Sequence, residues 1–166
     1  MPSVFKEMSC GMSVMYIHYG SKEFEPMRFM PIKNKELGVK PEGGLWASPV
    51  GCEFGWKEWC ASSEYSKCDE ENSFLFSLSE NANILYINSV CDLDSLPKAS
   101  NIIPISLSWV TLDFEKLLKD GIDAVQVNMS DEVCNDFTNA ANRLYFKLYG
   151  WDCDSTLVMN RDVIVI

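Results

Sequence analysis

The chain has 166 residues, of which 47% are hydrophobic, 23% charged and 12% aromatic, and this composition indicates a globular fold rather than a disordered or collagen-like chain. The net charge of −10 argues against broad contacts with nucleic-acid phosphates or anionic lipid, because such contacts need clustered Lys and Arg. No hydrophobic run approaches the ~20 residues of a membrane-spanning helix. The length predicts a single domain over 1–166, with 1–11 as a loose N-terminal arm.

Short runs of β-branched and aromatic residues predict the strands. Two of these runs, 74–78 and 84–87, are joined by a polar turn. The connection over 22–43 holds three prolines and several charges, and a connection this long inside a compact domain is usually functional. The predicted strands cover 14–18, 45–48, 74–78, 84–87, 105–109, 123–127, 155–159 and 163–166.

Three segments have the apolar spacing of helices. The first lies at 56–60, where two tryptophans and a cysteine stand at i, i+3 and i+4. The second begins at a Thr111 cap and ends at Gly121, and the third covers 130–148. Strands in clusters with interspersed helices, and no regular βαβ alternation, predict the α+β class.

The seven cysteines are odd in number and never form a CxxC pair, which indicates reduced thiols in a cytoplasmic protein. Cys52, Cys60 and Cys68 stand at equal eight-residue steps and leave a zinc site open as an alternative. We expect no metal, because structural zinc normally uses closer ligand pairs and His18, the only histidine, lies far upstream. His18 also leaves a Cys/His hydrolase open, although no local signature selects a cysteine.

Three further segments are informative when they are taken together. Segment 17–21 reads IHYGS, a strand end that runs into a glycine turn. Segment 43–49 reads GGLWASP, a glycine pair followed by a short aromatic strand, and 154–160 reads DSTLVMN, an acid at the head of a late strand. In this order they resemble the ADP-ribosyltransferase superfamily, and most closely its diphtheria-toxin and poly-ADP-ribose-polymerase branch, which is named for its His, Tyr and Glu.

The resemblance includes departures from the pattern of that branch. His18 matches the family histidine, Trp46 stands at the tyrosine position and Asp154 at the glutamate position. Tyr19 separates His18 from Gly20, whereas the family has His-Gly directly. Trp46 keeps a flat π face but has no phenol hydroxyl. Asp154 reaches one methylene less than glutamate, and a displacement of about 1 Å can cost on the order of a hundredfold in rate.

The resemblance implies two small, mostly antiparallel sheets that form a cleft for NAD, with flanking helices. It also implies an NAD-dependent mono-ADP-ribosyltransferase, which is a glycosyltransferase. The acidic charge favours a protein acceptor over nucleic acid, and the small size fits a toxin-like or phage-type effector. In the cleft, His18 would hydrogen-bond the adenosine ribose, main-chain groups of Gly20 would hold the carboxamide, and Trp46 would stack on the nicotinamide. Ser21, from the His-Gly-Ser motif, and Ser48 are the further expected NAD contacts.

The resemblance makes Asp154 the expected catalytic carboxylate, acting with His18. Hydrogen-bonded to a ribose 2′-hydroxyl, this carboxylate would stabilise the oxocarbenium-like transition state of glycosyl transfer. Asp152 shares the strand parity of Asp154 and stays open for the same role. Two other functions stay open. One is a catalytically weak or inactive module on the same fold that binds NAD, ADP-ribose or a protein; the other is an acidic inhibitor that covers a basic surface.

Overall fold

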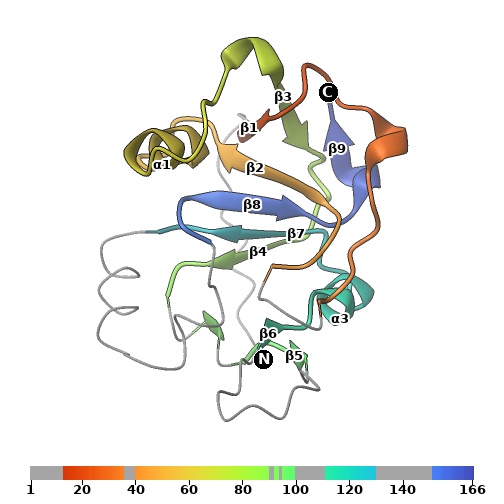
Figure 1. The fold of residues 1–166 in the computed structure, drawn as a ribbon. Helices are drawn as coiled ribbons and strands as arrows, with labels where there is room; N and C mark the ends of the chain where they lie inside the picture. Colours follow the sequence, from red (N-terminus) through yellow and green to blue (C-terminus); the bar gives the residue numbers. More distant parts are fainter. Residues whose placement is uncertain (1–12, 36–39, 90–91, 94, 100–110, 130–150) are drawn as a thin grey trace.

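The computed structural model describes residues 13–35, 40–89, 92–93, 95–99, 111–129 and 151–166 (Figure 1). The predictions for 1–11, 105–109 and 130–148 lie wholly outside the described residues. The strands are β1 (Met15–Tyr19), β2 (Leu45–Pro49), β3 (Ser73–Leu78), β4 (Ile84–Ile87), β5 (Lys98–Ala99), β6 (Thr111–Leu112), β7 (Ala124–Val127), β8 (Ser155–Val158) and β9 (Ile164–Val165). The helices are α1 (Trp56–Ser62) and α3 (Phe114–Lys119), with 3-10 turns at Pro26–Arg28, Glu70–Asn72 and Arg161–Val163.

Hydrogen bonding joins seven of the described strands into one sheet, in the order β4-β7-β8-β2-β1-β3-β9, and β5 and β6 form a separate two-stranded ribbon. Within the described part of the chain, β4 and β7 are the one parallel pair, and the remaining strand pairs are antiparallel. The prediction of a mixed α+β fold is confirmed. The expected division into two small sheets is not confirmed, because β2 bonds to β1 on one side and to β8 on the other.

The seven-stranded sheet curls on itself. Leu78 ends β3 and Ile84 begins β4, so six residue steps, which span at most about 22 Å, join strands five places apart in the order. Five spacings in a flat sheet would separate them by about 24 Å. The two ends of the sheet therefore approach each other, and Phe76 of β3 shares a buried cluster with Ala124 of β7. In Figure 1, β3 and β9 accordingly run steeply across the direction of β7 and β8.

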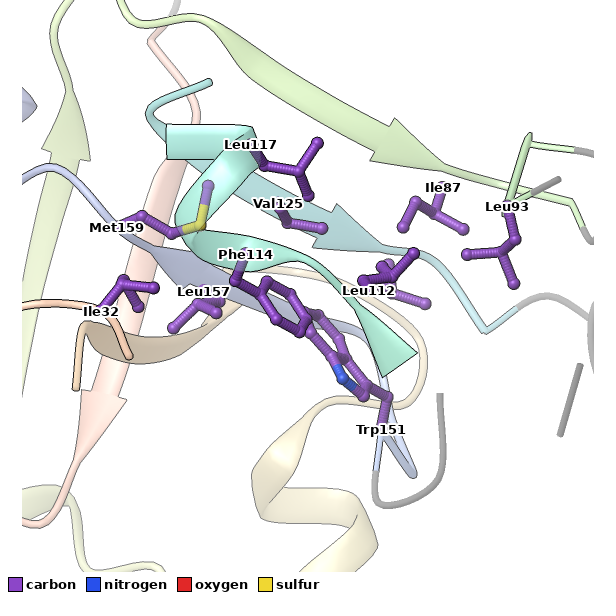
Figure 2. Close-up of a cluster of buried hydrophobic side chains, with 11 residues drawn as sticks. Ile32, Ile87, Leu93, Leu112, Phe114, Leu117, Val125, Trp151, Leu157 and Met159 are labelled. Atoms are coloured by element: carbon purple, nitrogen blue, oxygen red, sulfur yellow. The ribbon is translucent and has the colours of Figure 1, made fainter. Parts of the chain in front are cut away.

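Two buried clusters lie on the two faces of this sheet. The inner cluster fills the curl and consists of Tyr16, Leu45, Ala47, Phe76, Leu78, Ala124, Val158 and Val163. The outer cluster lies on the opposite face, where α3 covers β7 and β8 (Figure 2). It consists of Ile32, Ile87, Leu93, Leu112, Phe114, Leu117, Val125, Val127, Trp151, Leu157 and Met159.

The cap of α3 differs from the prediction. Asp113, not Thr111, caps the helix, since its side chain accepts a hydrogen bond from the Lys116 N–H, while Thr111 belongs to β6. Gly121 follows the helix at φ +92° and its N–H bonds the Leu118 carbonyl, as predicted for a C-terminal stop.

Hydrogen bonds and a close turn hold the described part of the connection over 22–43 against the rest of the fold. Asn34 accepts the Phe114 N–H at 3.0 Å and donates to the Asp113 carboxylate at 2.8 Å, which ties the connection to the start of α3. A β-bridge joins Lys33 to Glu42. Gly43, at φ +79°, then passes so close to the preceding chain that an added Cβ would lie 2.1 Å from the Pro31 carbonyl oxygen.

Candidate functional site

A cavity of about 240 Å³ opens where β1, β2, the start of α1 and the segment before β8 meet. His18, Trp46 and Ser48, which the sequence analysis selected, all line it. Ligand pockets of drug-sized molecules run from roughly 300 Å³ upward, so this cavity is small for a ligand the size of a dinucleotide.

The hydrogen bond of His18 fixes its tautomer. His18 stands near the end of β1, and its Nδ1 lies 2.7 Å from the carbonyl oxygen of Trp46. A carbonyl only accepts, so Nδ1 carries the proton and the neutral ring presents Nε2 as an acceptor. The ring packs against Phe74, with centroids 5.1 Å apart. His18 is therefore an oriented acceptor for a ligand hydroxyl.

β2 supplies the aromatic wall of the cavity. Leu45 and Ala47 point into the inner cluster, so the alternation of the strand sends Trp46 and Ser48 to the other face. The Trp46 ring meets the Trp151 ring edge-on at 4.7 Å, which seats it against the outer cluster. Ser48 Oγ accepts the Trp56 N–H at 2.9 Å and so joins β2 to the first turn of α1.

Lys40 places a cation among these rings. Its Nζ lies 4.8 Å from the centroid of the Trp46 ring and 5.9 Å from that of the Trp56 ring. Such contacts between a cation and aromatic faces are attractive. Burial lowers the pKa of Lys40, an effect that the nearby Asp152 carboxylate opposes. Lys40 lies in the long connection over 22–43, which the sequence analysis marked as functional without selecting a residue.

The two candidate carboxylates differ in position. Asp152 lines the cavity and is exposed, whereas Asp154 is not among the described residues that line it. The Asp154 carboxylate accepts the Met129 N–H at 2.6 Å, and its own N–H bonds the Phe54 carbonyl at 2.8 Å. Asp154 therefore holds three chain segments together, and Asp152 is the carboxylate that a ligand in the cavity can reach.

Two further predicted residues stay outside the cavity lining. The Gly20 N–H bonds the Asn72 carbonyl at 2.9 Å, so its main-chain donor is not available to a carboxamide. An added Cβ on Gly20 would lie 3.7 Å from His18 Nε2, and the glycine therefore keeps that face of the ring open. Ser21 Oγ donates to the Glu23 carbonyl within its own turn.

The cysteines in the described part of the chain give no metal centre, since its His, Cys, Asp and Glu side chains nowhere form a group of three that could hold a metal ion. Cys153 and His18 both line the cavity, which brings the two residue types of a Cys/His hydrolase to one site. Burial raises the pKa of the Cys153 thiol to about 12, however, and a nucleophilic cysteine needs the opposite shift. The burial of the Cys153 thiol and its raised pKa therefore do not favour the hydrolase.

Sequence reasoning did not select Lys40, Trp56 or Tyr19 as lining residues. Tyr19 directly follows His18, Trp56 was assigned only to the predicted helix at 56–60, and Lys40 precedes Pro41 at the end of the connection over 22–43. A basic residue a few positions before a glycine pair and an aromatic strand is the signal that could have found it.

No protein-family model, curated protein or solved structure matches the chain, so the geometry of the cavity carries the functional argument. Within the described residues, no helix is long and apolar enough to span a membrane.

Proposed function

We propose that the cavity binds the nicotinamide half of NAD and that the protein transfers ADP-ribose from NAD to a protein acceptor. The observation that carries this proposal is the meeting of His18, Trp46 and Ser48 in one cavity. These residues come from two separate sequence segments, which the resemblance to the ADP-ribosyltransferases assigns to NAD.

The shape and polarity of the cavity support a nicotinamide ribose as its occupant. The indole of Trp46 offers a flat aromatic face to a planar ring. His18 Nε2 is an acceptor for a sugar hydroxyl, because Nδ1 is already held by the Trp46 carbonyl. We assign this acceptor to the nicotinamide ribose in place of the adenosine ribose that the resemblance implies, because His18 and Trp46 line the same small cavity. In this proposal Trp46 binds the nicotinamide ring and His18 binds the ribose, which are the two parts of a nicotinamide nucleoside.

The proposed chemistry assigns the catalytic carboxylate to Asp152 in place of Asp154. The glycosidic bond between the nicotinamide nitrogen and the ribose C1′ breaks, and its electron pair leaves with nicotinamide. The resulting oxocarbenium-like ribose is stabilised by a carboxylate at the 2′-hydroxyl, and the acceptor nucleophile then bonds to C1′ and loses its proton. Asp152 lies at the cavity with its carboxylate exposed, where it can take this position.

The strands form one continuous curled sheet in place of the two sheets that the resemblance implies, and the curl divides it into two limbs. The strands β1, β3 and β9 form one limb of the sheet and β8, β7 and β4 the other, with β2 between them. The cavity lies at this junction, since β1, β2 and the entry to β8 all line it.

One observation favours a non-catalytic module as the second candidate. The carboxylate at the position of the family glutamate, Asp154, is held by the Met129 N–H and does not line the cavity. If Asp152 does not replace it, the protein binds NAD or ADP-ribose without breaking the glycosidic bond.

Incubation with labelled NAD and a cell lysate tests the proposal. We expect labelled protein acceptors and release of nicotinamide. The Asp152→Asn variant should lower the rate of nicotinamide release by about a hundredfold or more, because it removes the charge that stabilises the transition state. NAD binding without label or nicotinamide release in the wild type would contradict the transferase and establish the module.

The matched variant Asp154→Asn separates the two carboxylates. It keeps the size of the side chain and weakens the bond to Met129, so we expect a lower melting temperature and nicotinamide release within a few fold of the wild type. Loss of nicotinamide release in Asp154→Asn with retention in Asp152→Asn would reverse the assignment.

A further inference from the structure

We propose that Lys40 is the phosphate-binding residue of the cavity, and that it makes the protein prefer phosphorylated nicotinamide nucleotides to nicotinamide compounds without phosphate. This inference rests on the proposed function and adds a specificity-determining residue to it.

The N–H donors of the Lys40 ammonium group are available to a ligand. A lysine ammonium carries three N–H donors. Lys40 is half-buried, and none of the described residues accepts a hydrogen bond from its Nζ. The Trp46 and Trp56 rings supply only their π faces. Lys40 Nζ is not among the buried polar atoms of the described residues that lack a partner, so it still reaches solvent, and a ligand in the cavity can replace water as its hydrogen-bond acceptor.

The charge of the surroundings selects an anionic group as that acceptor. Among the described residues that line the cavity, Lys40 is the one Lys or Arg, in a protein whose net charge is −10. An anionic ligand is repelled by such a protein unless a local cation receives it. Asp152 lies near enough to favour the charged form of Lys40, but the two do not form an ion pair among the described contacts.

The parts of NAD differ in charge in a way that fits this position. Its nicotinamide ring is cationic, its riboses are neutral, and its phosphates carry the negative charge. The nicotinamide ring would occupy the Trp46 face, where Nζ now lies 4.8 Å from the centroid. The flexible four-carbon stem of lysine lets the ammonium leave that face as the ring enters. The first phosphate, attached through the same ribose, is then the strongest acceptor within its reach.

A pair of ligands that differ by one phosphate tests the inference. Nicotinamide mononucleotide carries the phosphate and nicotinamide riboside lacks it, and calorimetry gives the Kd of each. For the wild type we expect the mononucleotide to bind about tenfold tighter or more, as a charge-assisted hydrogen bond predicts. In Lys40→Met the ratio of the two Kd values should fall to about one. Both ligands place the same nicotinamide ring on Trp46. Any cost of moving the Lys40 ammonium away from Trp46 therefore affects both Kd values equally and cancels in their ratio.

Two matched variants complete the test. Lys40→Arg keeps the cation and should retain most of the wild-type ratio. Lys33→Met removes an exposed positive charge that does not line the cavity, and should leave the ratio unchanged. Melting temperatures check that each variant is folded. An equal ratio in wild type and Lys40→Met, with both ligands bound, would overturn the role of Lys40 alone. Failure of the wild type to bind either ligand would overturn the proposed function and this inference with it.

Discussion

At the scale of single residues, the bond between His18 and Trp46 links two members of the site through the main chain. His18 Nδ1 is held by the carbonyl of Trp46, not by its side chain. A substitution of the Trp46 ring therefore leaves the orientation of the imidazole in place, and the contributions of the two side chains to ligand binding can be measured separately.

The buried thiol beside the site should be inert. A pKa of about 12 leaves about one Cys153 in ten thousand ionised at pH 8, and the thiolate is the form that reacts with alkylating agents. We expect iodoacetamide to leave Cys153 unmodified at pH 8 in the folded protein and to modify it in 6 M guanidinium. Peptide mass spectrometry measures both. Rapid alkylation of Cys153 in the folded protein would return the Cys/His hydrolase to consideration.

Only part of the site follows from single residues in the sequence. His18, Trp46 and Ser48 could be selected because short motifs surround them. Asp154 was selected because it stands at the family glutamate position, and shared strand parity left Asp152 open beside it. β8 begins at Ser155, however, so strand alternation does not apply to either residue, and the two side chains lie in different places. Lys40 lies in an irregular connection, where no period indicates the direction of a side chain.

At the scale of elements, local patterns predicted the strands of the seven-stranded sheet but not their partners, and they did not predict β5 or β6. The runs at 74–78 and 84–87 were found from their composition, yet β3 and β4 lie five places apart in the strand order. Partners depend on contacts between distant segments, such as the parallel pairing of β4 with β7, and no local pattern encodes these. The wrong cap for α3 has a local cause, because Thr111 and Asp113 are both good N-cap residues.

The turn that leads into β2 provides a prediction at this scale. Gly43→Ala should lower the free energy of unfolding by about 3 kcal/mol, because its Cβ would collide with the Pro31 carbonyl at a φ of +79°. Gly51→Ala is the matched control, with a φ of +81° and nothing within 4 Å of its Cβ, and should cost only about 1 kcal/mol. Urea denaturation measures both. Equal losses would show that the close approach at Gly43 has no role in stability.

At the scale of the whole molecule, β8 connects the two buried clusters, since Leu157 belongs to the outer cluster and Val158 to the inner one. Removing the Leu157 side chain should therefore weaken the whole fold and not one face of it. We expect Leu157→Ala to lower the free energy of unfolding by about 2–5 kcal/mol. Its thermal transition should stay single, with tryptophan fluorescence and far-UV circular dichroism changing together. Separate transitions for the two probes would show that the faces unfold independently.

The central place of β2 has a consequence for how this protein can change during evolution. Ala47 belongs to the inner cluster and also lines the cavity, and Trp46 lines the cavity while it packs against the outer cluster. A substitution at either residue therefore changes the cavity and the packing of the fold together. Lys40 and Asp152 lie outside the strands and are free of that double constraint. The lining of the cavity can therefore change at Lys40 and Asp152 without a change in the strands, whereas a change at Trp46 or Ala47 also alters a buried cluster.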